Sequence, residues 1–236
     1  MISVELINGN YMKELYKHWG EFSCECYNTP IEYAERVGHA CANQSHFSGS
    51  RTEYFKFRIR GISRACSLQL NRHKIGVELN QQSQRYCDMN GVNFVIPPTI
   101  AENQEALKKY TELMEQSIKT YGEIQQILKS QGKNKEGANQ DARYCLLESC
   151  ETQGTWGFTL EALIHFMHKR LCIRSQWEIR QLANLMKKEV ISVLPELENT
   201  LVPHCEYLMW CPEGSHCCGK FPTRQQVIDN NFIVTK

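Results

Sequence analysis

The sequence predicts an α+β fold, with more helix than strand, built around a small and mostly antiparallel sheet. Two patterns carry this prediction. Residues 53–59 (EYFKFRI) alternate between polar and apolar side chains, as in a half-buried strand. Residues 101–130 repeat apolar side chains at helical spacing over the longest such stretch of the chain. We therefore expect one main domain, residues 1–202, followed by a Cys-rich tail, residues 203–236.

The residues before this strand and the strand itself show distinct patterns. Residues 1–50 mix short helical stretches with turn signals such as Asn28-Thr29-Pro30. The alternation that follows places Phe55, Phe57 and Ile59 on one face of the strand, which predicts that this face meets the core. Gly61 is expected to end the strand.

A helix is predicted next, over residues 62–73 (ISRACSLQLNRH). The side chains expected to face inward from it are Ile62, Ala65, Cys66 and Leu68. Asn90-Gly91 predicts a turn, and residues 92–96 (VNFVI) predict a short strand.

The apolar stripe of the 101–130 helix indicates a core or a subunit interface. The rest of the chain predicts, in order, a polar loop at 131–140, a helix beginning within 141–147, a short strand at 155–159, helices at 160–170 and 175–194, a bend or stop at Pro195, and loop from residue 203 onward.

Composition and charge exclude several classes of protein. Hydrophobic residues make up 42% and charged residues 22% of the chain, which is ordinary for a globular protein. The formal net charge is +1, which argues against a protein that works on nucleic acid or on an anionic membrane. The first residues, MISVELINGN, do not resemble a signal peptide, and no apolar run reaches the ~20 residues of a membrane span. A cytoplasmic protein is expected.

The chain holds twelve cysteines, which we interpret as free thiols in a reducing compartment. The tail gathers thiols and imidazoles that are chemically suited to zinc, at Cys205, Cys211, Cys217, Cys218, His204 and His216. Their spacing does not match a standard zinc pattern, so no metal site is predicted. Pro203-His204-Cys205 has no context that would make its thiol a nucleophile.

One polar cluster stands out in the stretch RHKIGVELNQQSQRY, residues 72–86. Gln69, Arg72 and His73 are expected to share one helical face, and Ser83 and Arg85 bring back a hydroxyl and a second guanidinium. Such a loop could hold an anion from two sides. The alternative is a solvated basic turn, because exposed arginines are common and usually contribute little.

Several blocks of sequence around this cluster occur in a recognisable order. They are SHFSGSRTEYFKFRIRGISRACSLQLNRHK (45–74), RHK…NQQSQRY (72–86), DARYCLLESCET (141–152), RLCIRSQWEIRQLA (170–183) and CPEGSHCCGK (211–220). Together they resemble the flavin-dependent thymidylate synthases, whose signature is Arg-His-Arg followed by Ser-x-Arg-Tyr.

This resemblance implies a reaction, its cofactors and an assembly. dUMP would receive a one-carbon unit from methylenetetrahydrofolate, and FAD reduced by NADPH would supply the hydride. The cofactor would carry most of the chemistry, so the protein would orient the reactants and provide charge. The family also implies its own α+β fold and a homotetramer whose active sites are shared between subunits. Small molecules would be its other partners, with no nucleic acid and no membrane.

The resemblance also assigns substrate contacts at matched positions. Arg170 would be the catalytic residue, facing the uracil ring and stabilising negative charge there. The residues implied to contact dUMP are Gln69, Arg72, Gln81, Gln82, Ser83, Gln84, Arg85, Arg143 and Arg170. Without the resemblance, Arg170 and Arg174 would be interpreted as helix-end residues that cap or pair with acids.

A second set of matched positions implies flavin contacts: His46, Ser48, Arg72, His73, Lys74, Gln81, Thr159, Glu161 and His165. Lys74 stands where the family usually has Arg, and Gln81 where many members have Glu. Thr159 and Glu161 stand where many members have Asn and Arg. Taken alone, His73 would be interpreted as a helix-terminal histidine.

The departures at these positions leave two alternatives open. The first is another C5 modification of a pyrimidine deoxynucleotide, such as hydroxymethylation, on the same scaffold. The second, suggested by the Cys/His tail and the local arginines, is a non-catalytic module that binds zinc or nucleic acid.

Overall fold

The structure is a computed structural model that describes residues 1–229, and it divides into two compact units. Unit 1 comprises Met1–Ser3, Ile59–Arg72 and Asn80–Thr155. Unit 2 comprises Val4–Arg58, His73–Leu79 and the described chain from Trp156 onward. The two units interleave along the sequence, because the chain passes from one to the other within its strands.

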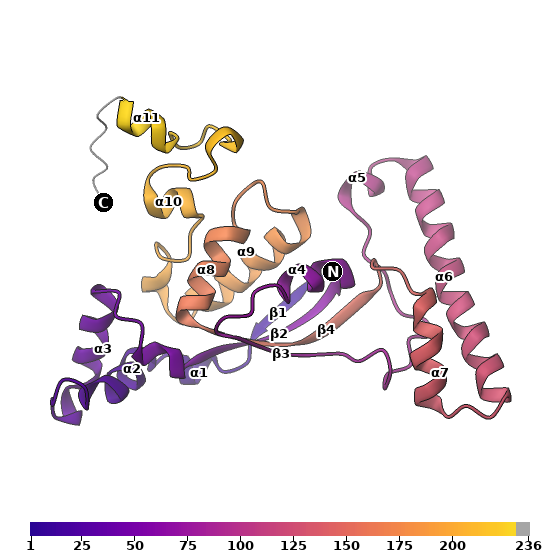
Figure 1. The fold of residues 1–236 in the computed structure, drawn as a ribbon, viewed down its shortest axis with the longest axis horizontal. Helices are drawn as coiled ribbons and strands as arrows, with labels where there is room; N and C mark the ends of the chain where they lie inside the picture. The colour runs from indigo at the N-terminus through magenta and orange to yellow at the C-terminus, as the bar shows by residue number, and fades with distance from the viewer. Residues whose placement is uncertain (230–236) are drawn as a thin grey trace. The chain divides into compact units, whose positions relative to one another are not determined.

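Four strands form one small sheet, in the order β1-β2-β4-β3 (Figure 1). They are β1 (Ser3–Leu6), β2 (Tyr54–Ser63), β3 (Val77–Gln81) and β4 (Glu151–Thr159). The sheet is antiparallel and helices dominate the rest of the chain, which confirms the predicted α+β class.

Strand β2 confirms the predicted alternation, since Phe55, Phe57 and Ile59 are all fully buried. The prediction that Gly61 ends the strand is wrong, because β2 continues to Ser63. Gly61 has φ +70°, and a Cβ there would lie 2.5 Å from the carbonyl oxygen of Met1. The glycine therefore permits a close backbone approach within the strand.

Unit 2 opens with short helices: α1 (Gly9–Met12), α2 (Leu15–Cys24), the 3₁₀ turn η1 (Ile31–Tyr33), α3 (Ala34–Asn43) and the 3₁₀ turn η2 (Gly49–Thr52). Helices α2 and α3 pack side by side at two glycines (Figure 1). A Cβ on Gly20 would lie 1.6 Å from the carbonyl oxygen of Ala34, and one on Gly38 would lie 1.8 Å from that of Tyr16. The two backbones can approach this closely only because both positions lack a side chain.

Helices α8 (Leu160–Arg170) and α9 (Trp177–Ile191) also belong to unit 2. The predicted bounds of α8 are confirmed, and α9 is shorter than the predicted 175–194. Both helices begin at a capping side chain. Thr159 Oγ1 accepts from the Ala162 N–H, and Gln176 Oε1 accepts from the Glu178 and Ile179 N–H groups. A 3₁₀ turn, η4 (Pro195–Leu197), follows at the predicted bend.

Unit 1 carries α4 (Arg64–Leu70), α5 (Pro98–Ala101), α6 (Gln104–Ser130), α7 (Lys135–Ala142) and the 3₁₀ turn η3 (Arg143–Cys145). The helix predicted from residue 101 begins at Gln104, because the Asn103 side chain caps it. The helix α7 replaces most of the loop predicted at 131–140 and includes the first two residues of the helix predicted at 141–147, and η3 follows it there. The predicted strand 92–96 is a single antiparallel bridge, from Phe94 to Cys150.

Helix α4 is shorter than the predicted 62–73. Ser63 caps its start by accepting from the Cys66 N–H at 2.9 Å, and the helix ends at Leu70. The predicted inward position of Leu68 is wrong, because this side chain is 51% exposed. Arg72 and His73 lie beyond the end of the helix, so they do not share its face with Gln69.

The tail predicted to be loop contains short helices, so that prediction is wrong. They are α10 (His204–Leu208), the 3₁₀ turn η5 (Gly214–His216) and α11 (Arg224–Asp229). The backbone pairs Cys211 with Thr223 in a parallel bridge, which closes the segment between them into a loop. The last part of the predicted tail, residues 230–236, lies outside the described residues.

None of the described helices is long and apolar enough to cross a membrane.

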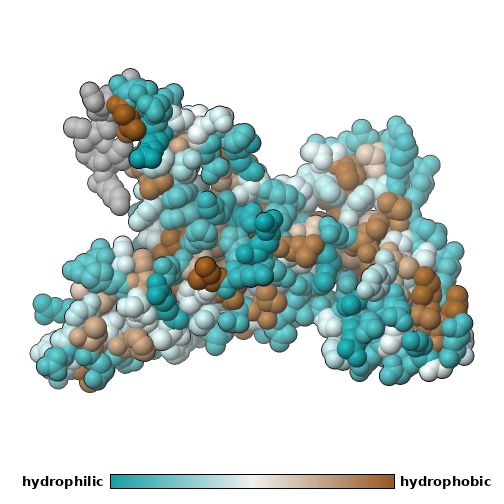
Figure 2. Space-filling view, in the orientation of Figure 1, coloured by the Kyte–Doolittle hydropathy of each residue, from teal (hydrophilic) through white to brown (hydrophobic). Residues whose placement is uncertain are grey.

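Figure 2 shows hydrophobic side chains at the surface over α6. Leu113 and Ile127 of this helix are 58% and 56% exposed. They lie outside the predicted apolar stripe, whose Met114 and Tyr121 are fully buried, so that stripe does pack in the core.

Candidate active site

Gln81, at the end of β3, lies at the centre of a hydrogen-bond network in unit 1. Its Nε2 donates to Ser67 Oγ at 2.9 Å and to Thr152 Oγ1 at 3.1 Å. Its Oε1 accepts from Asn71 Nδ2 at 3.1 Å. The amide thus joins β3 to β4 and to the end of α4. Because both of its ends are engaged, the side chain is held in one orientation.

The loop after β3 carries the next group of candidate dUMP contacts. Half-buried Gln82 donates its N–H to the Gln153 carbonyl at 2.8 Å, and Gln84 is also half-buried. Ser83 Oγ accepts from the Arg85 N–H at 3.2 Å, so the hydroxyl shapes the turn. The Arg85 guanidinium is exposed and extends over the Tyr86 ring, 5.4 Å from its centroid.

Helix α7, which was not predicted, anchors this loop. Buried Asn139 donates from Nδ2 to the carbonyl oxygens of Arg85 and Cys87, at 3.1 and 3.3 Å. Its Oδ1 accepts from Gln125 Nε2 of α6 at 2.6 Å. Glu136 of α7 also lies 3.8 Å from the Arg85 guanidinium. The position of the loop after β3 is therefore set by α6 and α7.

Two half-buried arginines stand near each other in unit 1. Burial lowers the pKa of Arg64 below its ordinary value, and the positive charge of Arg143 lowers it further. Neither side chain has an ion-pair partner among residues 1–229. Adjacent guanidinium groups without a carboxylate form a cationic surface suited to an anion. Arg143 was assigned from the sequence, whereas Arg64 was not.

The remaining unit 1 candidates are at the end of α4. Gln69 is half-buried and Arg72 is exposed. The Arg72 guanidinium forms no ion pair within the described part of the chain.

In unit 2, three segments meet at the first turns of α8. Arg51, just after Ser48, is ion-paired with Glu161. The Thr159 N–H donates to the Gly76 carbonyl at 2.9 Å, which brings the loop of Lys74 to the start of the helix. His46, Ser48, Lys74, Glu161 and His165 are all exposed there. The structure thus brings together the candidate flavin residues that it places in unit 2.

His73 contacts two residues of α8 besides Arg170. Its ring centroid lies 6.1 Å from that of His165 and 5.0 Å from that of Phe166, both edge-on. Arg170 Nε donates to His73 Nε2 at 3.0 Å. Burial, and then the charges of Arg170 and His165, lower the pKa of His73 from 6.5 to about 4. The imidazole is therefore neutral at pH 7 and can accept this hydrogen bond.

Besides His73, three candidate flavin residues of unit 2 already have side-chain partners. The Thr159 hydroxyl is buried and caps α8, and the Glu161 carboxylate accepts from Arg51 Nε at 2.8 Å. His46 Nδ1 lies 3.4 Å from the Tyr27 hydroxyl.

Arg170 and His73 line a cavity of about 370 Å³ in unit 2. The Cys-rich tail also lines this cavity, with Cys205, Cys211 and Cys218 among its residues there. The imidazoles of His168 and His204 stack at 5.1 Å, which fixes α10 against α8. No pattern in the sequence predicted that the tail would reach Arg170.

The twelve cysteines are all free thiols, as expected from the sequence. Within residues 1–229, no three His, Cys, Asp or Glu side chains are arranged to hold a metal ion.

Comparison with known proteins identifies the family. A family model described as thymidylate synthase complementing protein matches residues 10–196. The chain is 40% identical over 174 residues to a flavin-dependent thymidylate synthase of Nitratidesulfovibrio vulgaris, covering 73% of this chain and 71% of that protein.

Two further relatives carry the same name. One, from Clostridium tetani, is 40% identical and covers 70% of this chain and 69% of its own length. The other, from Pyrococcus furiosus, is 32% identical over 231 residues and covers 90% of both chains. The chain therefore belongs to the family of the thymidylate synthase complementing protein.

Proposed function

We propose that this chain is a flavin-dependent thymidylate synthase, which converts dUMP to dTMP. Methylenetetrahydrofolate is the carbon donor and NADPH is the reductant. FAD, when bound, supplies the hydride that completes the methyl group.

One contact carries this proposal. Arg170 and His73 come from separate blocks of the resemblance, 97 residues apart, and are joined by a hydrogen bond. The neutral imidazole accepts from Arg170 Nε, and this bond helps to fix the orientation of the guanidinium plane. A fixed cation of this kind can stabilise negative charge on the uracil ring nitrogen and oxygen. Among the described residues, no other candidate arginine is held by a candidate histidine.

The residues at the start of α8 fit FAD chemically. The diphosphate of FAD is anionic, and Lys74, Arg51 and the Ser48 hydroxyl are exposed donors on segments that meet there. The flavin ring is planar and aromatic, and the neutral His73 imidazole offers a face of similar polarity. His46 and His165 are exposed nearby on the same segments, and we propose them as further contacts.

We assign dUMP to the cationic and amide groups of unit 1. Arg143 and Arg85 supply guanidinium forks suited to its phosphate. Gln82, Ser83 and Gln84 lie on the anchored loop before Arg85, and Gln69 and Arg72 lie at the end of α4. The three internal hydrogen bonds of Gln81 suggest that it acts by holding this loop in place.

The assembly and setting follow from the same family. The matched residues 10–196 support a catalytic domain of residues 1–202 with the Cys-rich tail after it. We propose a homotetramer with active sites shared between subunits, and the exposed apolar side chains of α6 support a contact between copies. The free thiols favour a reducing compartment such as the cytoplasm.

The test is a product assay on the purified protein. It should be yellow, show a flavin spectrum, and convert dUMP to dTMP when methylenetetrahydrofolate and NADPH are present. The nucleotide product is identified by mass. Omitting NADPH or methylenetetrahydrofolate should each abolish the product, and a protein that forms no dTMP with all components present contradicts the proposal.

The same assay separates the alternatives. Hydroxymethyl-dUMP without dTMP would indicate a different C5 modification on this scaffold, as the departures at Thr159 and Glu161 allow. A colourless protein with stoichiometric zinc would indicate a non-catalytic module.

A further inference from the structure

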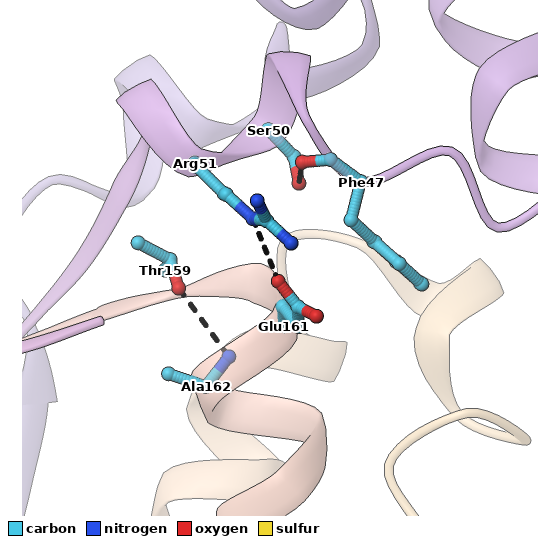
Figure 3. A network of polar contacts seen from close by, with 6 residues as sticks. All are labelled: Phe47, Ser50, Arg51, Thr159, Glu161 and Ala162. Carbon is cyan, nitrogen blue, oxygen red and sulfur yellow. Dashed lines mark hydrogen bonds and ion pairs between the residues drawn. The ribbon is translucent and has the colours of Figure 1, made fainter. Parts of the chain in front are cut away.

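Arg51 and Glu161 form an ion pair that links two segments of unit 2. Arg51 Nε donates to Glu161 Oε2 at 2.8 Å, across 110 residues of sequence. Figure 3 shows the guanidinium reaching from η2 to the carboxylate on the first turn of α8. The two side chains are 60% and 48% exposed. An ion pair this exposed contributes little to stability, so its geometry calls for another explanation.

The backbone beneath Arg51 is fixed. Ser50 Oγ donates to the Phe47 carbonyl and Thr52 Oγ1 to the Gly49 carbonyl, both at 2.9 Å. Gly49 is buried against Trp19, where a Cβ would lie 2.5 Å from Cδ1. The turn is therefore seated in the core while Arg51 projects from it (Figure 3).

The backbone beneath Glu161 is fixed as well. The Thr159 hydroxyl accepts from the Ala162 N–H at 3.3 Å and so sets the first turn of α8 (Figure 3). Both partners of the ion pair thus rise from anchored backbone. The guanidinium loses little additional freedom when it binds a ligand.

The charges of the pair suggest which ligand this is. A lone Glu161 carboxylate would repel the anionic diphosphate of a cofactor that binds at Ser48 and Lys74. Arg51 cancels that charge through Nε. Its two terminal nitrogens have no hydrogen-bond partner within residues 1–229. They provide the fork that binds phosphate oxygens.

We propose that Arg51 binds the diphosphate of FAD, and that Glu161 is a positioning residue that holds Arg51 rather than a cofactor contact. This inference rests on the proposed function. The sequence assigned Glu161 to the flavin and did not single out Arg51, which lies three residues after Ser48. The cation that many family members carry at the position of Glu161 would here come from a different segment.

The first test measures the FAD dissociation constant by the change in flavin fluorescence on binding. R51Q should weaken FAD binding by roughly tenfold or more, the loss expected for charge-assisted hydrogen bonds. The dissociation constant of dUMP and the thermal midpoint should stay unchanged. R58Q is the matched control, because Arg58 forms an exposed ion pair with Glu5 elsewhere in unit 2, and it should bind FAD as the wild type does.

Salt dependence separates a charge contact from a structural role. The FAD dissociation constant of the wild type should rise with salt concentration, and that of R51Q should rise less steeply, because one cation no longer meets the diphosphate. E161Q keeps an oxygen acceptor for Arg51 and should bind FAD close to the wild-type level.

Charge exchange is the sharpest test. R51E places two carboxylates together and should weaken FAD binding more than R51Q does. R51E/E161R restores the ion pair and returns a guanidinium to the same place, so it should recover at least tenfold of that loss.

Unchanged FAD affinity in R51Q, or no recovery in R51E/E161R, would overturn the assignment of Arg51. A large loss in E161Q would instead assign the contact to Glu161. If the variants give these contrary results while the wild type binds FAD and makes dTMP, only the assignment of Arg51 fails and the proposed function stands. If the wild type binds no FAD, the proposed function fails with it.

Discussion

Arg170 Nε lies 3.0 Å from His73 Nε2 and donates a hydrogen bond to it. The bond requires a neutral imidazole, and burial together with the Arg170 and His165 charges lowers the pKa of His73 to about 4. Arg170, whose positive charge helps to lower the pKa of His73, is thus also the donor that requires a neutral His73 imidazole. The pair is held together over the physiological pH range.

Arg170→Ala should remove transition-state stabilisation without unfolding the protein. The loss of a preorganised donor lowers kcat by about 10²–10³-fold, or about 3–4 kcal/mol. Steady-state kinetics on dUMP and far-UV circular dichroism measure the two effects. Arg174→Ala is the control, because Arg174 is exposed and lines the same cavity. Near-normal turnover in Arg170→Ala would remove Arg170 from the mechanism.

His73 should act through Arg170. His73→Leu removes this acceptor and holds the guanidinium less firmly in its orientation, which should lower kcat by up to about 100-fold. His73→Gln keeps an oxygen acceptor and should retain much more activity. Rescue by glutamine but not by leucine is the diagnostic result. Equal losses in both variants would show that the hydrogen bond does not matter.

Stability should fall as the pH falls from 6.5 towards 4. Burial, followed by the charges of His204, His165 and Lys169, lowers the pKa of His168 to about 4, as for His73. In the unfolded chain both histidines bind a proton near pH 6.5. The unfolded state therefore binds more protons in this window. Each residue should reduce the free energy of unfolding by at most on the order of 3 kcal/mol.

Urea unfolding at pH 7 and pH 5 measures this effect. The difference in unfolding free energy between the two pH values should shrink in His168→Gln. It should not change in His216→Gln, since His216 is exposed. An unchanged difference in His168→Gln would contradict the prediction.

Gln81→Glu should destabilise unit 1 even though many family members carry Glu there. The Ser67 hydroxyl already donates to the Arg64 carbonyl at 2.8 Å, so it is an acceptor for Gln81. A carboxylate cannot donate to it, and the mismatch should cost about 1–3 kcal/mol. Urea unfolding at pH 7 tests this, with exposed Gln153→Glu as the matched control. Equal stability of the two variants would show that the network rearranges freely.

Thiol reactivity should follow burial. Cys26 and Cys218 are exposed and should react first with a thiol reagent in the native protein. The buried thiols should react only after denaturant is added: Cys24, Cys41, Cys66, Cys150 and Cys211. The denatured chain should yield twelve thiols in total. Loss of the fast phase in a Cys26→Ser/Cys218→Ser variant is the control, and fewer than twelve thiols would contradict the free state.

The elements that the sequence predicted well are those with a strong local pattern. The alternation of β2 and the extent of α8 could both be predicted, because period and helix capping are local properties. Helix α7 was missed because it is polar and contains Gly137, which composition alone assigns to a loop. Its stability comes from Asn139 and Gln125, a contact with α6 that no local pattern reports.

The candidate site, too, was predicted in part from the sequence and decided in part by tertiary structure. The order of the motif blocks determined the family and the residue types that would meet nucleotide and flavin. Which of those side chains already have partners was decided by tertiary structure. Gln81 is committed to three internal bonds and Glu161 to Arg51.

The sequence by itself determined the α+β class, the family, and the choice of Arg170 and His73 as candidates, because these depend on residue identity and order. Only the tertiary structure decided that Arg170 meets His73, that Arg51 meets Glu161, and that the tail reaches the same cavity as Arg170. The physical reason is that hydrogen bonds, ion pairs and desolvation depend on distances of a few ångströms between residues far apart in the chain.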